Sequence, residues 1–432
     1  MSTISSSCPP SPSSPSGPSR TVVVGQGYVG LPLALRAVDV GHDVVGVDLD
    51  QRRVAALAAG TSFVGDVSDA RLRRALDTGR YRPTADYADA REFDVAVITV
   101  PTPLRDSLPD LRYVESAARS LARLLRRGAT VILESTTSPG TTAEVLVPLL
   151  EAGSGLRAGV DFSVGYSPER IDPGNADWTF ETTPKLVSGI DAASLRRVSS
   201  FYEQLVEQVV PVSGTREAEL AKLLENTFRH VNIALVNELA VAARELGIDA
   251  HEAIDAASTK PFGFMKFTPG PGVGGHCLPV DPTYLSWEVR RKTGRPFRFV
   301  ELANEINEGM PAQVVERAEA LLNDFSRAVR GAKIILVGLA YKPDSADARE
   351  SPALRVAELL RTKGAHVLAV DPYVDDRDWP VGVERVDSAR AAAECDLAVV
   401  LTPHSTVDLA PLAGLPVLDT RGVMPAQQAV RL

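Results

Sequence analysis

The sequence predicts an α/β fold: two Rossmann-like doubly wound domains joined by a central helical domain with a long spine helix. Short β-branched runs alternate with helical patterns as far as Leu205, and the alternation resumes at Lys333. Between these regions, residues 216–246 have the periodicity of one continuous helix. A glycine-rich turn, Gly25–Gly30, connects the first strand to the first helix, as is typical of doubly wound sheets.

The composition argues against a nucleic-acid-binding, membrane or disulfide-rich protein. The chain has 432 residues, 44% of them hydrophobic, which is enough for two or three domains. A net charge of −9 argues against a nucleic-acid partner, because binding a phosphate backbone needs a basic surface. No apolar run approaches the roughly 18 residues of a membrane span, so we expect no membrane partner. The three cysteines are widely spaced, which argues against disulfides or a metal site and favours a reducing, cytoplasmic compartment.

The chain divides into four expected segments. Residues 1–20 form a Ser/Pro-rich tail that lacks the basic and apolar regions of a signal peptide, so we expect it to be disordered. A first Rossmann domain follows over residues 21–205. The central helical domain covers 206–310, and a second Rossmann-like domain covers 311–432.

The first Rossmann domain is predicted strand by strand. Residues 21–25 are a buried strand stopped by glycine, and a helix from Leu31 to Val40 follows. The next strands are expected at 43–47, 93–100 and 130–133. After the last of these, Thr141-Thr142-Ala143-Glu144 has the form of a capping box.

The rest of the chain is first helical and then α/β again. Helical sequence continues to about Lys260 and reappears from Pro282 to Glu308, and Ser351-Pro352 has the pattern of a helix start. The final expected strands lie at 333–338, 366–371 and 397–401.

The two α/β domains echo each other in sequence. Each has a strand ending in glycine, then a strand ending in aspartate, Asp48 or Asp371, and later a strand leading into a Thr-Pro step. This echo predicts two nucleotide-binding-type domains. A purely structural second domain would give the same pattern, so both interpretations stay open.

The turn after the first strand predicts a dinucleotide site. Gly25, Gly27 and Gly30 form a GxGxxG motif between a strand and a helix, which lets a pyrophosphate approach the helix N-terminus. Asp48 would accept hydrogen bonds from ribose hydroxyls and repel a 2′-phosphate, which favours NAD over NADP. Arg52 and Arg53 lie nearby and temper that preference.

A second glycine-rich loop, Phe267–Pro282, carries Cys277 four residues before Asp281. A buried structural cysteine is the ordinary interpretation of a lone thiol. An exposed glycine loop instead suits a nucleophile, with Asp281 moving a proton or orienting water. His276 is adjacent in sequence, and we expect it to be structural. Cys395 precedes an apolar strand and is expected to be a buried structural thiol.

Further polar residues are expected around the same crevice. Lys222 and Asn226 lie one turn apart on the long helix, either as a solvated stripe or as a covered site that stabilises negative charge. Polar patches also follow expected strands, where open α/β sheets bind ligands. These patches are Val100-Pro101-Thr102-Pro103, Glu134-Ser135-Thr136-Thr137 and Tyr166-Ser167-Pro168-Glu169-Arg170.

Taken in order, these motifs resemble the UDP-glucose/GDP-mannose dehydrogenase family of nucleotide-sugar 6-dehydrogenases. The resemblance covers nearly everything after the tail. It rests on Gly25–Gly30, Ser167-Pro168-Glu169-Arg170, Lys222 with Asn226, Gly274-Gly275-His276-Cys277 through Asp281, and Tyr341-Lys342-Pro343-Asp344 with Arg349-Glu350-Ser351-Pro352.

The resemblance implies an N-terminal NAD domain, a dimerising central domain with the catalytic loop, and a C-terminal UDP-sugar domain. It implies oxidation of the sugar C6 alcohol to a carboxylate with two NAD. Cys277 would form a thiohemiacetal and then a thioester, Lys222 and Asn226 would stabilise the oxyanion, and Asp281 would transfer protons. Thr136 and Glu169 would position the hydrolytic water.

The resemblance also implies the binding residues and a homodimer formed through the central helix. The implied cofactor contacts are Gly25, Gly27, Tyr28, Val29, Gly30, Asp48, Arg53, Pro101, Thr102, Ser135, Thr136 and Arg349. The implied substrate contacts are Glu169, Arg170, Lys222, Asn226, Phe267, Gly274, Tyr341 and Lys342.

The form of the cysteine loop is similar to family members that act on UDP-N-acetylhexosamines. His276 and Val280 occupy positions where members acting on UDP-glucose more often have serine and lysine. UDP-N-acetylglucosamine is therefore the first expectation, with UDP-glucose and UDP-N-acetylmannosamine as alternatives.

Two other functions compete with this expectation. A two-electron dehydrogenase of β-hydroxyacid type shares the layout but needs no thiol. A catalytically inert nucleotide-sugar-binding protein would need neither Lys222, Asn226 nor Cys277, and all three are present.

Overall fold

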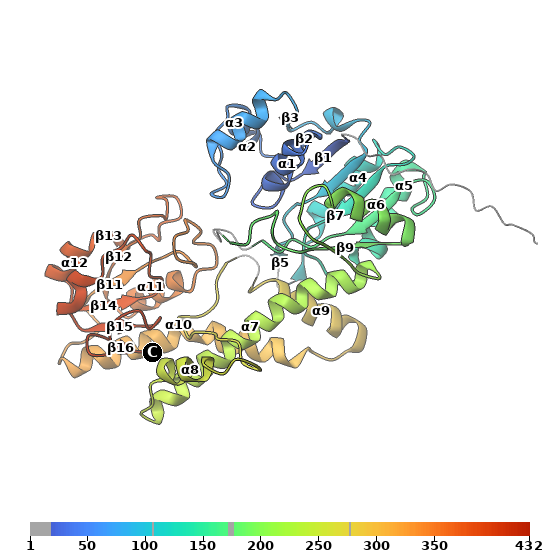
Figure 1. Cartoon of the computed structure of the whole chain (residues 1–432). Helices are drawn as coiled ribbons and strands as arrows, with labels where there is room; N and C mark the ends of the chain where they lie inside the picture. The colour runs from blue at the N-terminus through green and yellow to red at the C-terminus, as the bar shows by residue number, and fades with distance from the viewer. Residues whose placement is uncertain (1–18, 106–107, 172–176, 276–277) are drawn as a thin grey trace, which may run out of the picture. The chain divides into compact units, whose positions relative to one another are not determined.

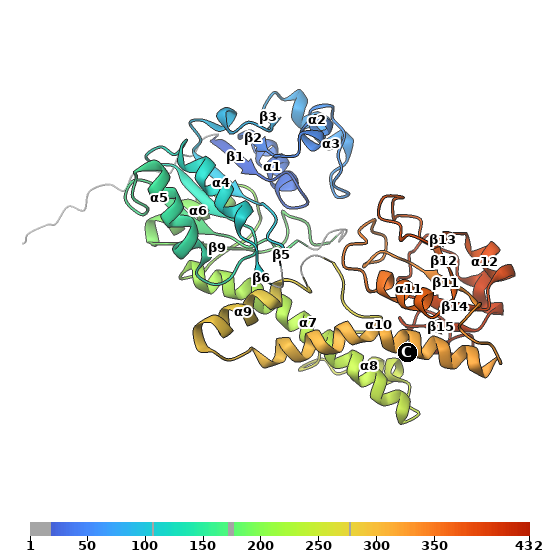
Figure 2. The same ribbon diagram turned by 180° about the vertical axis from the view of Figure 1, so that it is seen from behind.

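The structure of the protein is a computed structural model that describes residues 19–105, 108–171, 177–275 and 278–432. The chain forms two compact units, the first ending at Lys222 and the second beginning at Leu223. Figure 1 labels the elements of both units, and Figure 2 shows them from behind. Most of the predicted tail, residues 1–18, lies outside the described residues.

The first unit contains an eight-stranded sheet with the order β10-β9-β8-β7-β4-β1-β2-β3. Paired strands are parallel except β8 and β9, which run antiparallel. The chain leaves the sheet centre in opposite directions from β1 and β4, which makes their carboxyl ends a topological switch point. The strands are β1 (Arg20–Val24), β2 (Asp43–Val47), β3 (Tyr81–Thr84), β4 (Val95–Ile98), β7 (Thr130–Leu133), β8 (Ser163–Tyr166), β9 (Lys185–Gly189) and β10 (Val209–Pro211), with a separate hairpin of β5 (Leu104–Arg105) and β6 (Leu108–Pro109).

Helices cover both faces of this sheet. Buried side chains of α1, α3 and α6 pack on one face, and those of α4 and α5 pack on the other. Val23 of β1 contributes to the first core, and Val22 and Val24 to the second, so the strand is buried on both sides. The helical segments are α1 (Gly30–Asp39), α2 (Gln51–Ala58), α3 (Asp69–Asp77), η1 (Tyr87–Ala90), α4 (Arg112–Ala122), η2 (Thr142–Leu146), α5 (Val147–Ser154) and α6 (Ala192–Tyr202).

The long predicted helix is α7 (Thr215–Glu245), which starts in the first unit and continues as the first element of the second. It is followed by α8 (Ala250–Ser258), α9 (Asp281–Thr293) and α10 (Arg298–Asp324). The helical sequence expected from Pro282 to Glu308 is divided between α9 and α10, and α10 continues through Pro311. Buried residues on both sides of the proline, such as Met310 and Val314, pack into the core of the second unit, which outweighs the hydrogen bond that proline removes.

The second unit also contains a six-stranded parallel sheet with the order β13-β12-β11-β14-β15-β16. In β11, Ile334 and Leu336 share a core with α10 and α11, whereas Ile335 and Val337 share one with α12. The strands accordingly lie between α11 and α12 in both views (Figures 1 and 2). The elements are β11 (Lys333–Val337), α11 (Pro352–Thr362), β12 (His366–Val370), β13 (Glu384–Arg385), α12 (Ser388–Glu394), β14 (Leu397–Val400), η3 (Ala410–Gly414), β15 (Val417–Asp419) and β16 (Val430–Arg431).

The predicted fold class is confirmed: each unit has a doubly wound sheet, and helices lie between them along the chain. Strands at 43–47 and 130–133 have the predicted bounds. Ser351 caps α11 as expected, with its hydroxyl accepting from the N–H of Ala353.

The capping box predicted at 141–144 is wrong. Thr141 makes no side-chain cap bond, and its hydroxyl donates instead to the carbonyl of Ser138 at 2.7 Å. Glu219 of α7 accepts from the N–H of Gly140 at 2.5 Å and of Thr142 at 2.9 Å. The cap therefore comes from a helix distant in sequence.

Candidate active site

The turn between β1 and α1 holds three glycines in different surroundings. Gly25 has a φ of +93°, and a Cβ there would lie 2.6 Å from the carbonyl oxygen of Thr99. A Cβ on Gly30 would collide with the carbonyl oxygen of Gly25, so this glycine lets α1 pack against the turn. Nothing lies within 4 Å of a Cβ built on Gly27. The backbone at Gly27 therefore faces open space, where a pyrophosphate can approach the N-terminus of α1.

Asp48 follows β2 and retains acceptor capacity. Its Oδ2 accepts from the N–H of Gln26 at 3.0 Å, and its Oδ1 accepts from the N–H of Asp50 at 2.9 Å. The side chain is 10% exposed and keeps lone pairs for ribose hydroxyls. Arg52 pairs with Asp50 at 3.0 Å, and Arg53 lies 3.8 Å from Asp48. Both arginines face carboxylates, so the residues present fit NAD, whose ribose carries no 2′-phosphate.

The loops after β4 and β7 lie beside each other at the same edge of the sheet. The hydroxyl of Ser135, which follows β7, donates to the carbonyl of Val100, which follows β4, at 2.7 Å. The carboxyl ends of β1, β4 and β7 thereby gather most of the predicted cofactor contacts, as expected at a switch point. In addition to the glycines, this edge carries Tyr28, Val29, Pro101, Thr102, Ser135 and Thr136.

Glu169 follows β8 and is held by three donors. Its Oε1 accepts from the N–H groups of Arg170 at 2.6 Å and Ile171 at 2.5 Å, and its Oε2 accepts from Lys185 at 3.1 Å. Burial raises the pKa of Glu169, although the N–H groups and the charges of Lys222 and Arg170 oppose it. A carboxylate with a raised pKa is suited to accept a proton from water. The guanidinium of Arg170, a predicted substrate contact, donates to the carbonyl of Pro184 at 2.6 Å.

The start of α7 is fixed by Glu219. In addition to its bonds to Gly140 and Thr142, this fully buried carboxylate accepts from the hydroxyl of Thr142 at 2.7 Å. Burial raises the pKa of Glu219 to about 7. Lys222 lies one helical turn beyond Glu219 and is half-buried, so it is not part of a fully solvated stripe.

In the second unit, two predicted catalytic residues contact each other. The Nδ2 of Asn226, on α7, donates to the carboxylate of Asp281, the first residue of α9. Asp281 is 4% exposed. The amide and the carboxylate that the sequence places 55 residues apart are therefore hydrogen-bonded.

The glycine-rich loop packs closely on the segment after β11. A Cβ on Gly274 would lie 2.7 Å from the carbonyl oxygen of Glu350, and one on Gly275 would lie 2.9 Å from the ring of Tyr341. The N–H of Gly275 also donates to the carbonyl of Arg349 at 3.1 Å. Only glycine fits at these two positions, which join two of the motifs that carry the resemblance.

Other residues anchor the start of this loop. The ring of Phe267 packs edge-on against Phe228 of α7, with ring centres 5.9 Å apart. The N–H of Gly270 donates to Asn237, also on α7, at 2.9 Å. The predicted nucleophile Cys277, with His276, lies outside the described residues.

The loop that carries Tyr341 and Lys342 is supported by a buried network that the sequence analysis did not identify. Asp371 Oδ2 accepts from the N–H groups of Leu339 at 2.7 Å and Ala340 at 3.0 Å, and from His404 Nε2 at 2.8 Å. His404 Nδ1 accepts from the N–H of Asp344 at 3.0 Å, so its Nε2 carries the proton. The sequence marks Asp371 as an aspartate at the end of a strand but gives no signal for His404, because the partners of both residues are distant in sequence.

Two arginines of the second unit differ in their partners. Arg349, a predicted cofactor contact, forms a two-bond pair with Asp347, at 2.8 and 2.6 Å. Arg421, which sequence analysis missed, packs its guanidinium against the backbone of Gly270. Burial lowers the pKa of Arg421, with Asp419 opposing it. Its position after β15, at the carboxyl edge of the second sheet, suits an anionic ligand.

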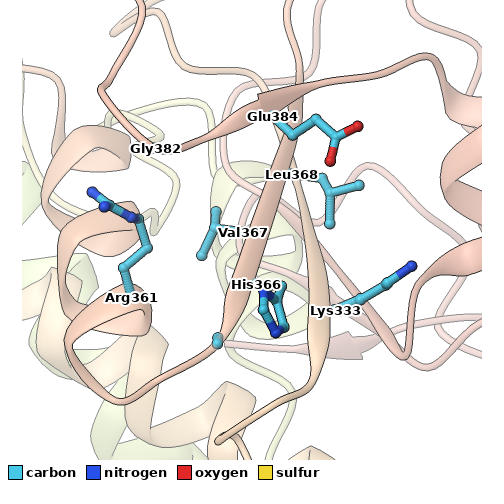
Figure 3. Close-up of a pocket in the computed structure, with 8 residues that line it drawn as sticks. Lys333, Arg361, His366, Val367, Leu368, Gly382 and Glu384 are labelled. Carbon is cyan, nitrogen blue, oxygen red and sulfur yellow. The ribbon is translucent and has the colours of Figure 1, made fainter.

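A shallow hollow in the second unit lies at the wrong edge of the sheet for a nucleotide. It is lined by Lys333 and His366, the first residues of β11 and β12, together with Arg361 and Glu384. Figure 3 shows that these side chains diverge, with Arg361 on one side of the strand and Lys333 and Glu384 on the other. Ligands of open α/β sheets bind at the carboxyl ends instead.

Further observations concern the cysteines, metals and membranes. Cys395 is buried, and burial raises the pKa of its thiol to about 11, in line with the predicted structural role. Among the described residues, no cluster of His, Cys, Asp or Glu has the composition of a metal site. Within the same part of the chain, no helix combines the length and hydropathy needed to cross a membrane.

Comparison with known proteins agrees with this geometry. Three domain models of the UDP-glucose/GDP-mannose dehydrogenase family match the chain: the NAD binding domain over residues 19–206, the central domain over 216–309 and the UDP binding domain over 313–426. The chain is 38% identical over 386 residues to UDP-N-acetyl-D-mannosamine dehydrogenase of Pyrococcus horikoshii, covering 89% of each chain. It is 38% identical over 363 residues to UDP-N-acetyl-D-glucosamine 6-dehydrogenase of Pseudomonas aeruginosa, covering 83% of this chain and 84% of that one.

Solved structures give the same result. The structure of the Pyrococcus horikoshii UDP-D-ManNAc dehydrogenase has a TM-score of 0.86 at 35% identity, covering 94% of this chain and 96% of that one. A UDP-glucose dehydrogenase from Pyrobaculum islandicum also has a TM-score of 0.86, at 29% identity, covering 96% of this chain and 98% of that one. The chain therefore belongs to the UDP-glucose/GDP-mannose dehydrogenase family of NAD-dependent oxidoreductases that act on nucleotide sugars.

Proposed function

We propose that the protein oxidises the C6 hydroxyl of a UDP-N-acetylhexosamine to the carboxylate, with UDP-N-acetylglucosamine as the first candidate substrate. The cysteine loop and the Pseudomonas aeruginosa relative support this sugar. UDP-N-acetylmannosamine is the second candidate, because the Pyrococcus horikoshii relative is equally similar. UDP-glucose is the third.

The proposed chemistry has two oxidations and one hydrolysis. NAD, when bound, supplies the hydride acceptor for each oxidation. Cys277 adds to the C6 aldehyde after the first oxidation, and the second converts the thiohemiacetal into a thioester. Water then forms a bond to C6 while the C6–sulfur bond breaks, which releases the acid and the thiol.

Each remaining residue of the proposed site has a task on this route. Lys222 and the amide of Asn226 stabilise negative charge on the C6 oxygen. Asp281 transfers protons, and Thr136 and Glu169 orient and deprotonate the water. Lys342 and Arg421 neutralise the diphosphate, and Phe267 contacts the uracil.

The contact between Asn226 and Asp281 is the observation that carries this proposal. A buried carboxylate that accepts from an amide is held in one orientation, as proton transfer requires. A two-electron dehydrogenase has no thioester to hydrolyse, and an inert binding protein has no need for such a pair.

We also propose that the protein is a homodimer formed through α7. Large apolar side chains on this helix are exposed at a helical spacing that puts them on one face. The exposed fractions are 61% for Leu224, 46% for Phe228, 59% for Leu235 and 44% for Leu239. Such a stripe favours an interface with a second copy. Leu235→Glu should yield monomers by light scattering; a dimer that persists unchanged would contradict this proposal.

The stoichiometry of NADH release tests the proposed reaction. With each UDP-sugar in limiting amount, we expect two NADH per sugar and the uronic acid by mass spectrometry. One NADH per sugar would favour the two-electron alternative, and none with any of the sugars would favour an inert binding protein. Cys277→Ser should keep the binding of NAD and UDP-sugar but form no acid. Cys395→Ser is the matched control and should retain turnover.

A further inference from the structure

A buried charged cluster lies beside the proposed base, Glu169. It exists because β9 runs antiparallel to β8 in an otherwise parallel sheet. The reversal puts Lys185, the first residue of β9, at the carboxyl edge of the sheet. Glu134 follows β7 and Glu169 follows β8 at that same edge. Three charged side chains from distant parts of the sequence thereby meet.

Lys185 is shared between the two carboxylates. Its ammonium forms an ion pair with Glu134 and lies 3.1 Å from Glu169 Oε2. The exposed fractions of the three side chains are 4% for Lys185, 0% for Glu134 and 14% for Glu169. Water therefore screens these charges little. Burial and the charge of Lys222 lower the pKa of Lys185, so its ammonium form depends on the two neighbouring carboxylates.

Aromatic residues complete the surroundings of this ammonium. The rings of Phe180 and Tyr202 lie 5.4 and 5.3 Å from Lys185 Nζ, within cation–π range. The hydroxyl of Tyr202 donates to Glu134 at 3.2 Å. Lys185 is thus held in one place by Glu169 and by three residues that have no assigned part in the reaction, Glu134, Phe180 and Tyr202.

We propose that Lys185 and Glu134 are positioning residues for the hydrolysis step: Lys185 fixes the carboxylate of Glu169, and Glu134 competes for the ammonium so that Glu169 stays basic. This inference rests on the proposed function, because only a thioester route needs a base for water. In the step concerned, a proton passes from water to Glu169, the water oxygen bonds to C6, and sulfur leaves.

The competition has a physical reason. An ammonium paired with Glu169 alone would stabilise its charged form and make it a weak base. Without an ammonium, burial would raise the pKa of the carboxylate further. The remaining charged groups that act on Glu169 are Lys222 of α7 and Arg170 beside it, and both favour the charged form.

The test is whether Lys185→Met and Glu134→Gln shift the pH profile of the steady rate in opposite directions. Pre-steady-state NADH release is followed with the full-length enzyme, NAD and the UDP-sugar found to turn over, and the steady rate after the burst is measured against pH. Lys185→Met should give a burst of two NADH per site and a steady rate lowered about tenfold. The rising limb of its pH profile should move up by about one unit, because Glu169 loses an opposite charge.

Glu134→Gln should move the same limb down by about one unit, because Lys185 then pairs with Glu169 alone. Lys185→Arg should restore the wild-type limb. A merely structural role would lower rates and stability without moving the two limbs in opposite directions. If Lys185→Met does not fold, Glu134→Gln decides the question by itself.

The inference and the proposed function fail differently. Wild-type enzyme that releases one NADH per sugar would overturn the proposed function, and this inference with it. Wild-type enzyme that releases two, with both variants unshifted or shifted in the same direction, would overturn the inference alone. Thioester accumulated on the Lys185→Met enzyme, detected by intact-protein mass, would support it.

Discussion

The two sheets of this molecule have the same plan around their first strand. In each, the first strand lies between the second strand and the later strand that follows the crossover, β4 or β14. In each, the first strand leads to a glycine with positive φ, +93° at Gly25 and +83° at Gly338. A Cβ on either glycine would be too close to a threonine carbonyl, that of Thr99 or Thr402.

The aspartates that follow the second strands differ. Asp48 accepts from two backbone N–H groups and remains 10% exposed. Asp371 accepts from four backbone N–H groups and His404, and its side chain is fully buried. The first carboxylate has capacity for a ligand, whereas the second is occupied by its own loops.

The two aspartates at equivalent strand ends, Asp48 and Asp371, thus have different roles. In the first unit Asp48 is available to bind ribose, and in the second Asp371 holds the backbone that carries Tyr341 and Lys342. The sequence echo predicts the shared sheet plan but says nothing about which carboxylate is free. Hydrogen bonding in the loops decides that.

The largest expected effect is on stability, from Asp371→Asn. Whichever way the new amide turns, its NH2 would face backbone N–H donors, either those of Leu339 and Ala340 or those of Tyr373 and Val374. Unpaired buried donors of this kind cost about 3 kcal/mol in the free energy of unfolding. Hydrogen exchange on peptides of the second unit measures the loss.

Asp48→Asn is the matched control for that measurement, since it makes the same chemical change at the equivalent position. Its cost in stability should stay below about 1 kcal/mol, because water can reach this side chain, which is 10% exposed, and it faces two backbone N–H donors rather than four. Equal losses in both variants would contradict the distinction between the two aspartates.

Much of the fold can be predicted from the sequence because its determinants are local. Apolar runs mark the strands at 43–47 and 130–133, and Ser351-Pro352 marks the start of α11. The capping of η2 cannot be predicted in this way, because Glu219 lies more than 70 residues beyond the helix that it caps.

The candidate site likewise contains residues that can be predicted from the sequence and residues that cannot. Gly27 and Asp48 can be named from the spacing of the GxGxxG motif, and Glu169 from its place after a strand and from the family resemblance. Lys185 and His404 cannot, because their roles depend on the antiparallel strand β9 and on loops that meet only in the folded chain. A single buried charged residue has no recognisable pattern in the sequence around it.

A second expected effect is an opposite response of the two units to pH. Burial raises the pKa of Glu219 to about 7, above the unfolded value of about 4.3. The resulting stability is complete below pH 4.3 and is lost as pH rises to 7. Between pH 4.3 and 7 the loss should be about 3 kcal/mol in the first unit. Glu219→Gln should remove this slope.

For Asp371, burial alone would raise the pKa, but the bonds from His404, Leu339 and Ala340 outweigh it and lower the pKa. Its stabilisation is therefore present above the unfolded value of about 3.9 and is lost as pH falls further. Hydrogen exchange on peptides of each unit between pH 3 and 8 separates the two responses. Parallel pH dependence in both units would contradict this assignment.

A third effect concerns cofactor binding. Asp48→Asn should raise the KM for NAD about tenfold, because a charged acceptor for the ribose is lost, which corresponds to about 1.4 kcal/mol. The preference for NAD over NADP should fall at the same time. Steady-state kinetics with NAD and with NADP measures both changes. The control is Asp371→Asn assayed at low temperature, which should leave the KM for NAD unchanged.

The smallest effect separates binding from packing within the glycine turn itself. Gly27→Ala should change the free energy of unfolding by only about 0.5 kcal/mol, because no atom lies within 4 Å of the added Cβ. It should still raise the KM for NAD several-fold, since the methyl group occupies space that the pyrophosphate needs. Gly338→Ala is the control in the second unit: its Cβ would meet the carbonyl of Thr402, so stability should fall while the KM for NAD holds. If Gly27→Ala destabilised the fold as much as Gly338→Ala, Gly27 would be required for packing rather than for ligand binding. The proposed difference between the glycine turns of the two sheets would then be wrong.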